Sequence, residues 1–312
     1  MSRKNLIIRE VPVPDENHPP APYQELPRHE FTFGIIAPKG GGKTTLMCNL
    51  LRMYAGYFHQ IWWISPTILS DDKLGWLKSQ KLLARNDRLL EFFKDLENGD
   101  PEQDKIVQNK RVDTQLDVVR HSEPEEAFTG IIPSDCFVDE YTDAGFKKIM
   151  DANKMIIDLA ESYGHSKHIA DRIAFIIDDP VGMDVYNSSR KSYFKGVNTR
   201  HRHYSASGFM VTQGYKEVPK TIRTNWTCIV IYEIGNMKEL YVIYEEFNMG
   251  LSWVNWREMY DYCTAEPHSF MFIDFQKPRG QRIMKNFTEY LTVIEEKKDD
   301  LNFINILQDD SS

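Results

Sequence analysis

One stretch of the chain, FTFGIIAPKGGGKTT at residues 31–45, constrains the fold more than any other. An apolar run from Phe31 to Ile36 is followed by three consecutive glycines, and Lys43 and Thr44 come directly after them. Glycines allow successive backbone N–H groups to surround phosphate oxygens, and a helix that begins here presents the positive end of its dipole to them. The pattern therefore predicts a strand, a phosphate-binding loop and the start of a helix.

The predicted loop gives its polar residues separate roles. Lys43 is expected to contact the β- and γ-phosphates of ATP, and the hydroxyl of Thr44 to complete the coordination of Mg²⁺. Ala37 replaces the first glycine of the usual G-x-x-x-x-G-K-[ST] pattern, and it is small enough for a tight turn. Lys39 lies one residue too close to Lys43 for the loop of the partitioning ATPases, so we reject that alternative. The predicted nucleotide-binding set is Ala37, Pro38, Lys39, Gly40, Gly41, Gly42, Lys43, Thr44 and Thr45.

The composition limits both the fold and the partners. With 312 residues, of which 41% are hydrophobic and 27% charged, the chain can form one large α/β domain or two small ones. A net charge of −8 is not typical of a protein covered by nucleic acid, so any contact with nucleic acid is expected to be local. The four cysteines are too scattered for a disulfide scaffold or a zinc site; they are Cys48, Cys136, Cys228 and Cys263.

The two ends of the chain differ in composition from the middle. Residues 1–28 are rich in proline and should form an extended arm, either free or docked on a neighbour, and residues 295–312 an acidic tail. Residues 29–294 are expected to form the phosphate-loop domain, with a mostly helical insertion at about residues 70–170, of which residues 98–126 are expected to be loop. No apolar run has transmembrane length, and residues 1–22 lack the features of a secretory signal, so we expect no membrane-spanning segment and a cytosol-like compartment.

A second chemical signal is the segment RIAFIIDDP at residues 172–180. Its apolar run leads directly into two acids, as in a buried parallel strand that presents carboxylates at its carboxyl end. We expect Asp178 to hold Mg²⁺ through water and Asp179 to orient and deprotonate the attacking water. The segment CFVDE at residues 136–140 is a weaker alternative, and its acids are better explained by the start of a helix.

The most basic stretch of this acidic chain is RKSYFKGVNTRHR at residues 190–202. It fits a loop that contacts nucleic-acid phosphates, with Arg190, Lys191, Lys195 and Arg202 as the contacting residues. A solvated helix face explains the same residues equally well. Arg200 and Arg202 could instead reach the γ-phosphate bound by a neighbouring subunit.

Several further apolar runs predict the remaining elements. Strands are expected at Gln60–Ser65, at Phe209–Gln213, which ends in a polar side chain able to sense phosphate or water, and at Thr227–Tyr232. Two more segments are interpreted as edge strands that bracket a helix around Val254–Tyr262; they are Leu240–Tyr244 and Ser269–Asp274. From these residues alone we infer a Mg²⁺-dependent NTPase of the α/β class with a central parallel sheet.

With these residues in place, the chain resembles the poxvirus-type genome-packaging ATPases of the FtsK/HerA superfamily, which occur in large DNA viruses, virophages and Polinton-like elements. The resemblance covers about residues 30–290 and rests on an ordered series, not on the phosphate loop alone. The series is APKGGGKTT (37–45), FIIDDP (175–180), TRHRHYSASGFMVTQ (199–213), VPKTIRTN (218–225) and the later YVIYEEFN and YDYCTAEPHSFMFID.

The resemblance implies a three-layer phosphate-loop NTPase sandwich of the ASCE type, in which the Gln213 strand lies between the strands that carry the loop and Asp178. It implies that Lys43, Thr44, Asp178, Asp179 and Gln213 are nucleotide and catalytic residues, and that Arg200 and Arg223 are γ-phosphate or inter-subunit arginines. It also implies a homo-oligomeric ring, a pentamer or a hexamer, that hydrolyses ATP to drive double-stranded DNA into a preformed capsid.

Such a motor would act in the host cytoplasm or viral factory, or with the virion, and would contact a capsid or vertex protein. Two alternatives stay open at this stage. One is a helicase or strand-translocating ATPase that acts on single strands. The other is a nucleotide-gated capsid-assembly protein, in which ATP sets only the conformation.

Overall fold

A mixed sheet forms the centre of the computed structural model, which describes residues 18–68, 72–97, 128–180, 183–186 and 192–294. Within these ranges the sheet has nine strands in the order β3-β2-β4-β5-β1-β6-β7-β8-β9. The six strands from β3 to β6 in this order are parallel, and β7, β8 and β9 continue the sheet in antiparallel fashion. The strands are β1 (Thr32–Ile36), β2 (Gln60–Ile64), β3 (Phe137–Val138), β4 (Ile173–Asp178), β5 (Ala206–Thr212), β6 (Cys228–Tyr232), β7 (Phe270–Asp274), β8 (Ile283–Lys285) and β9 (Glu289–Leu291).

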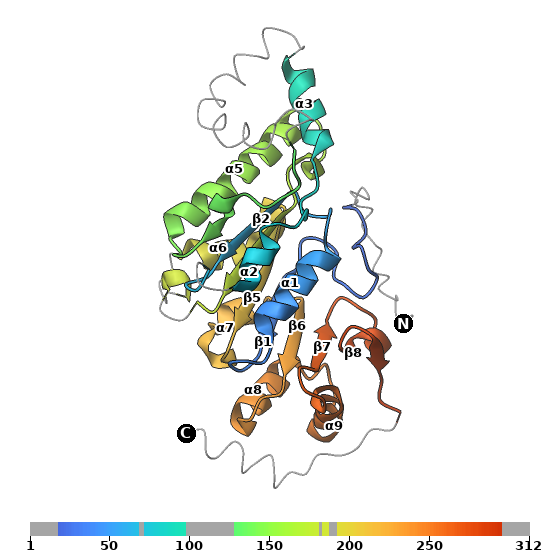
Figure 1. The fold of residues 1–312 in the computed structure, drawn as a ribbon. Helices are drawn as coiled ribbons and strands as arrows, with labels where there is room; N and C mark the ends of the chain where they lie inside the picture. The colour runs from blue at the N-terminus through green and yellow to red at the C-terminus, as the bar shows by residue number, and fades with distance from the viewer. Residues whose placement is uncertain (1–17, 69–71, 98–127, 181–182, 187–191, 295–312) are drawn as a thin grey trace, which may run out of the picture.

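Helices cover both faces of this sheet and give it the three layers predicted from the resemblance (Figure 1). One face packs against α1 (Lys43–Met53) and α2 (Asp72–Leu77), and α3 (Asp87–Glu97) lies against the second half of α5. None of the helices in the described ranges is long and apolar enough to span a bilayer. The helices of the opposite face are α5 (Asp143–Ser162), α6 (Tyr193–Arg200), α7 (Lys220–Arg223), α8 (Met237–Phe247) and α9 (Trp253–Thr264).

Short 3₁₀ turns connect several of these elements. They are η1 (Ser134–Cys136), η2 (Lys167–Ile169), η3 (Asp184–Tyr186), η4 (His201–Tyr204), η5 (Tyr215–Glu217) and η6 (Arg279–Gln281).

The central strands β1, β4 and β5 are buried on both faces, which explains their near-continuous apolar sequences. Two glycines on these strands make room for large side chains on the face covered by α5 to α9. A Cβ atom on Gly34 would lie 2.3 Å from the indole of Trp226, and one on Gly208 would lie 2.4 Å from the ring of Phe175. The predicted strands at 60–65, 172–178, 209–213 and 227–232 are confirmed, and so is the position of β5 between β1 and β4.

Two predictions about the last third of the chain are wrong. The segment Leu240–Tyr244 lies inside α8, whose first turn is capped by the Asn236 side chain. The buried residues Leu240, Ile243 and Phe247 follow the spacing of a helix face, which a run of apolar and aromatic residues conceals. The segment 269–274 does form a strand, β7, but β8 and β9 lie beyond it, so it is not an edge strand.

The acids of the segment CFVDE stand between a strand and a helix. Phe137 and Val138 form the two-residue strand β3 at the end of the sheet, and Thr142 caps the helix α5 that starts at Asp143. The side chains of Asp139 and Glu140 are exposed in the short connection. The predicted helix therefore starts after these acids, at Asp143, and the acids themselves directly follow the short strand β3.

Part of the proline-rich N-terminal arm packs on its own chain. The hydroxyl of Tyr54 donates a hydrogen bond to the Pro27 carbonyl (2.6 Å), and that of Tyr57 donates to the Pro19 carbonyl (2.9 Å). Leu26 is buried in the core between the sheet and α1. The predicted arm at residues 1–17, the loop at 98–126 and the tail at 295–312 lie outside the described residues.

Candidate nucleotide site

The carboxyl ends of β1, β5 and β4 meet at one edge of the sheet, which we call the carboxyl edge. Ile36 of β1 is in register with Thr212 of β5, and Val211 of β5 with Asp178 of β4. The next backbone groups continue this pairing, since Ala37 N–H donates to the Thr212 carbonyl (3.2 Å) and Asp179 N–H to the Val211 carbonyl (2.9 Å). The register thus brings the phosphate loop, Gln213 and the two acids to one level.

The phosphate loop has the backbone shape that its glycines predict. Gly40 and Gly42 have φ angles of 78° and 100°, which side-chain-bearing residues rarely adopt, whereas Ala37 is not among the residues with positive φ. Gly42 is the N-cap of α1 and offers no side chain to the first N–H groups of the helix. Those groups can therefore bind an anion.

Lys43 lies over this loop at the start of α1. Its ammonium group donates to the carbonyls of Ala37 (3.0 Å) and Pro38 (3.4 Å). Partial burial lowers the pKa of Lys43, while the carboxylates of Asp179, Asp178 and Glu217 oppose that shift. The same lysine thus adjoins both the anion-binding loop and the acids at the end of β4.

The two acids after β4 occupy different environments. Asp178 is the last residue of β4 and is only 6% exposed. Asp179 has a φ of 48° and receives a hydrogen bond on Oδ2 from the side-chain amide of Gln213. Its Oδ1 atom is buried and has no hydrogen-bond partner within the protein. Asp179 therefore has one oriented oxygen and one oxygen available to a ligand or water.

Two further residues at the carboxyl edge escaped the sequence analysis. Glu217, in η5, accepts a hydrogen bond from the Thr212 hydroxyl (3.1 Å) and lies close enough to Lys43 to affect its pKa. Burial raises the pKa of the Tyr186 hydroxyl, and the nearby charges of Glu217 and Asp179 add to that rise. Neither residue follows a strand directly, so the only signal in the sequence is that Glu217 lies in the connection after β5.

The residues predicted to hold Mg²⁺ fit that role by their chemistry. Thr44 at the start of α1 offers a hydroxyl, and Asp178 and Asp179 offer the oxygen ligands that Mg²⁺ prefers. The buried, unpartnered Oδ1 of Asp179 agrees with a site that is completed by an ion or its water. The described residues contain no group of three or more His, Cys, Asp or Glu side chains that could hold a metal by themselves, so phosphate oxygens and water would have to supply the other ligands.

Arg200 and Arg202, two of the predicted arginines, do not join this edge. Arg200 ends α6, and Arg202 lies in η4, just before the first residue of β5. They therefore lie at the amino edge of the sheet, about 20 Å from the carboxyl edge along the length of β5. Lys195 lies in the first turn of α6, and Arg190 and Lys191 lie outside the described residues. The described part of the basic stretch is helical, so the prediction of a loop is wrong for residues 193–202, and the alternative of a helix agrees with the structure there.

Arg223 is bound within its own chain. Its guanidinium forms two hydrogen bonds with the Glu246 carboxylate of α8 (2.8 and 3.0 Å) and one with the Val218 carbonyl (2.7 Å). It also lies over the ring of Tyr215, with 4.5 Å to the ring centroid. These contacts join the connection after β5 to α8, and the γ-phosphate or inter-subunit role of Arg223 stays a prediction.

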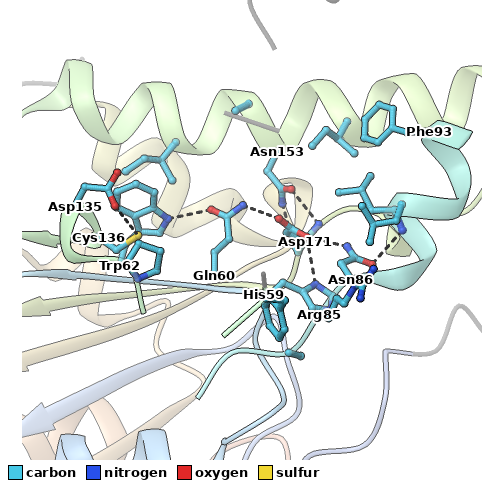
Figure 2. Close-up of a pocket in the computed structure, with 18 of the residues that line it drawn as sticks. His59, Gln60, Trp62, Arg85, Asn86, Phe93, Asp135, Cys136, Asn153 and Asp171 are labelled. Carbon is cyan, nitrogen blue, oxygen red and sulfur yellow. Dashed lines mark hydrogen bonds and ion pairs between the residues drawn. The ribbon is translucent and has the colours of Figure 1, made fainter. Parts of the chain in front are cut away.

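A cavity of about 500 Å³ lies elsewhere, between β2, α3 and α5. Figure 2 shows that Gln60 in its wall bridges the Trp62 indole and Asp171, and that Asn86 and Asn153 also bind Asp171 or its backbone. None of the predicted nucleotide or catalytic residues lines this cavity. The buried polar groups at its floor bind one another, which accounts for them as parts of the fold.

The sheet order, the glycine loop between β1 and α1 and the acids after β4 define a phosphate-loop NTPase fold of the ASCE type. The chain is similar in structure to the genome packaging NTPase B204 of Sulfolobus turreted icosahedral virus 2 in complex with AMPPCP, with a TM-score of 0.46 and 12% identity over 82% of this chain and 96% of that one. It is also similar to VirB4 of Thermoanaerobacter pseudethanolicus, with a TM-score of 0.37 and 14% identity over 84% and 90%. No protein-family model matches the sequence, and no curated protein shows significant similarity to it.

Proposed function

We propose that this protein is a Mg²⁺-dependent ATPase whose active site is the carboxyl edge of the sheet. The observation that carries the proposal is the meeting of the anion-binding start of α1 and Lys43 with the Asp179–Gln213 pair. A phosphate loop alone would support nucleotide binding. A loop beside a carboxylate with one unpartnered oxygen also supports hydrolysis.

Each residue of the site then has a defined task. The N–H groups at the start of α1 and the ammonium of Lys43 bind the β- and γ-phosphates and neutralise their charge. Lys43 moves from the carbonyls of Ala37 and Pro38 to the phosphates, since both positions adjoin the loop. When bound by Thr44 and Asp178, Mg²⁺ neutralises charge that develops on the phosphate oxygens.

Asp179 is the residue suited to activate water. Gln213 holds one oxygen of its carboxylate, so the other oxygen can accept a proton from a water molecule placed next to the γ-phosphate. Gln213 stands at the end of β5, between the loop and Asp179, where its amide can also contact that water. This arrangement supports in-line attack by water on the γ-phosphate.

We further propose that the hydrolysis drives double-stranded DNA into a preformed capsid. The ordered series of motifs supports this finer assignment, because the segments TRHRHYSASGFMVTQ and VPKTIRTN follow the two acids as they do in the poxvirus-type packaging ATPases. The exposed Arg200 and Arg202 are cations at the amino edge, where a second subunit or DNA phosphates could meet them. The proposed partners are a homo-oligomeric ring, DNA and a capsid or vertex protein, in a host cytoplasm or viral factory.

The test is ATP turnover by the purified full chain, measured with and without linear duplex DNA, together with its mass in solution. We expect Mg²⁺-dependent turnover that rises with duplex DNA in a multi-subunit species. Stimulation by single-stranded but not by duplex DNA would favour the helicase alternative instead. Nucleotide binding with no turnover in an assembled, DNA-bound oligomer would contradict an ATPase and favour the nucleotide-gated assembly protein.

A further inference from the structure

The connection between α9 and β7 approaches the phosphate loop from the side opposite the catalytic acids. In the sheet order, β4 and β5 lie on one side of β1, and β6 and β7 on the other. His268, which lies between α9 and β7, places its Nδ1 atom 3.3 Å from the Gly41 carbonyl. Because a carbonyl oxygen only accepts hydrogen bonds, the Nδ1–H group of His268 is the donor of this hydrogen bond and the Gly41 carbonyl is the acceptor.

His268 lies beside the residue that caps α1. A Cβ atom built on Gly42 would lie 3.5 Å from Nδ1 of His268 and 4.0 Å from the Tyr232 hydroxyl at the end of β6. The imidazole is exposed, whereas Tyr232 is buried. The two side chains therefore form a wall along the β6 and β7 side of the loop, in which the imidazole is the exposed part.

The local backbone is built to present this histidine. His268 has a φ of 64°, in the left-handed region that costs energy for any residue with a side chain. Ser269 holds the turn, since its N–H and its hydroxyl both donate to the Glu266 carbonyl (3.0 and 2.6 Å) and its hydroxyl accepts from the Glu266 N–H (3.1 Å). The exposed imidazole of His268 is thus carried by a strained backbone conformation, and the turn that holds it contains the buried Ser269.

The end of β6 is fixed as well. The hydroxyl of Tyr260, on α9, donates to the Tyr232 carbonyl (3.0 Å) and accepts from the Ile234 N–H (2.6 Å). Because α9 also leads into the turn of His268, one helix positions both parts of the wall. Such a wall is formed before any ligand arrives, which lowers the cost of ordering a binding site.

The direction of a bound nucleotide follows from the two sides of the loop. Its γ-phosphate must lie near Asp179 and Gln213, on the β4 and β5 side, if hydrolysis is to occur there. The α-phosphate and the nucleoside then extend away from these residues. The opposite side of the loop is where His268 and Tyr232 stand.

We propose, on the basis of the proposed ATPase function, that His268 and Tyr232 form the nucleoside subsite and that the His268 ring stacks on the purine base. Stacking of an aromatic ring on a base contributes binding free energy without a requirement for one hydrogen-bonding edge. The hydrogen bond to Gly41 fixes the ring relative to the phosphate loop. The ring that stacks on the base, His268, is therefore in direct contact with the loop that binds the phosphates.

The experiment compares the Kd of Mg·ATP with that of Mg·tripolyphosphate, which carries the phosphates without the nucleoside, by calorimetry. His268→Asn removes the ring and keeps a residue that tolerates positive φ. We expect about a tenfold weaker Kd for ATP and a Kd for tripolyphosphate within twofold of the wild type. His268→Phe keeps a ring and should restore ATP affinity to within about threefold of the wild type.

A matched control is His165→Ala, since His165 is also exposed and lies in the connection after α5, before the first residue of β4. It should change neither Kd. If His268→Asn weakened both ligands equally, or neither, stacking of this ring on the base would be excluded. If the wild-type protein bound neither ATP nor tripolyphosphate, the ATPase proposal itself would fail, and the subsite with it.

Discussion

At the scale of single residues, the neighbours of Asp179 determine what this acid can do. Gln213 occupies Oδ2, Oδ1 is buried without a partner, and Lys43 adds a positive charge nearby. A carboxylate that is oriented but not neutralised by an ion pair keeps its ability to take a proton. Asp178, fixed at the end of β4, is the better placed of the two acids for a structural role next to Mg²⁺.

We predict that Asp179→Asn leaves ATP binding within about threefold of the wild type and lowers turnover about 10²- to 10⁴-fold, the usual contribution of a general base. Single-turnover kinetics and equilibrium binding separate the two effects. Asp139→Asn is the matched control, because Asp139 also follows a parallel strand, β3, but is exposed at the end of the sheet. Loss of turnover in Asp139→Asn, with turnover retained in Asp179→Asn, would show that Asp139 and not Asp179 is the catalytic carboxylate.

Arg223 shows how a motif residue can serve the fold. Although partial burial acts in the opposite direction, hydrogen bonds from Arg223 and Tyr215 keep the pKa of Glu246 below its usual value. We predict that Arg223→Ala lowers the free energy of unfolding by about 1–2 kcal/mol, because it removes a bidentate charged pair. In a double-mutant cycle with Glu246→Gln, the two effects should not add.

The control for this pair is Lys220→Ala, an exposed cation on the same helix α7, which should change stability by less than about 0.5 kcal/mol. Urea denaturation measures both variants. An Arg223→Ala protein of normal stability but greatly reduced turnover would instead support the inter-subunit role implied by the resemblance.

At the scale of elements, the described part of the N-terminal arm is held by a histidine cluster made of His18, His29 and His168. The ring centroids of His18 lie 4.7 Å from His29 and 3.9 Å from His168. His29 is hydrogen-bonded to the hydroxyls of Ser205 and Ser207 at the start of β5. Glu30 and Lys167 face the cluster, with Glu30 3.2 Å from His18 and 3.3 Å from Lys167.

This cluster makes the stability of the fold depend on pH. Burial lowers the pKa of His29 well below its ordinary 6.5 and lowers that of His168 to about 4. Between pH 6.5 and 4 the unfolded chain therefore binds more protons than the folded one, so stability is lost as the pH falls through this range. Glu30, whose pKa stays below 4.5, contributes only at lower pH.

We predict that the temperature of the thermal midpoint decreases as the pH is lowered from 7 to 5. The decrease should be smaller in His168→Gln, because glutamine does not bind a proton when the chain unfolds. Scans by circular dichroism at several pH values measure it. His165→Ala, which alters an exposed histidine outside the cluster, should keep the full pH dependence. An equal decrease of the thermal midpoint in the wild type and in His168→Gln would show that His168 does not contribute to the pH dependence.

The elements also show which features of the fold a sequence can predict. Strands β1, β4 and β5 were predicted because strands buried on both faces have uninterrupted apolar sequences that end in polar residues. Helix α8 was not predicted, because aromatic residues on its other face give LYVIY the continuous apolar pattern of a strand. Glu217 and His268 were not predicted as site residues. Glu217 comes near Lys43 from η5, and His268 contacts the loop from the turn before β7, in both cases through the tertiary fold alone.

At the scale of the whole molecule, the two edges of the sheet present different groups. The carboxyl edge holds the phosphate loop and the acids, whereas Arg200 lies exposed at the amino edge, where its Nε donates a long hydrogen bond (3.4 Å) to the Gly196 carbonyl. Because β5 separates the two by about 20 Å, Arg200 cannot reach the γ-phosphate of its own chain. If it takes part in hydrolysis, it does so in the site of another subunit.

If the protein forms the proposed ring and Arg200 acts in a neighbouring site, this geometry predicts complementation between two inactive proteins. The Lys43→Ala protein has a defective phosphate loop but keeps Arg200. The Arg200→Ala protein lacks this arginine but keeps an intact loop. In a mixed ring with head-to-tail interfaces, about a quarter of the sites would combine an intact loop with an intact neighbouring arginine. Turnover should therefore appear on mixing the two proteins and should depend on their ratio.

Mixing Lys43→Ala with Asp179→Asn is the control, since both changes damage the same site and every protomer of that mixture has a defective loop or acid. It should stay inactive at all ratios. If the Lys43→Ala and Arg200→Ala mixture also stayed inactive although the subunits exchange, Arg200 would have no role in trans. Contact with DNA phosphates would then be the remaining proposed role of the exposed arginines at the amino edge. Such contacts need exposed cations but no precise alignment with a neighbour's active site.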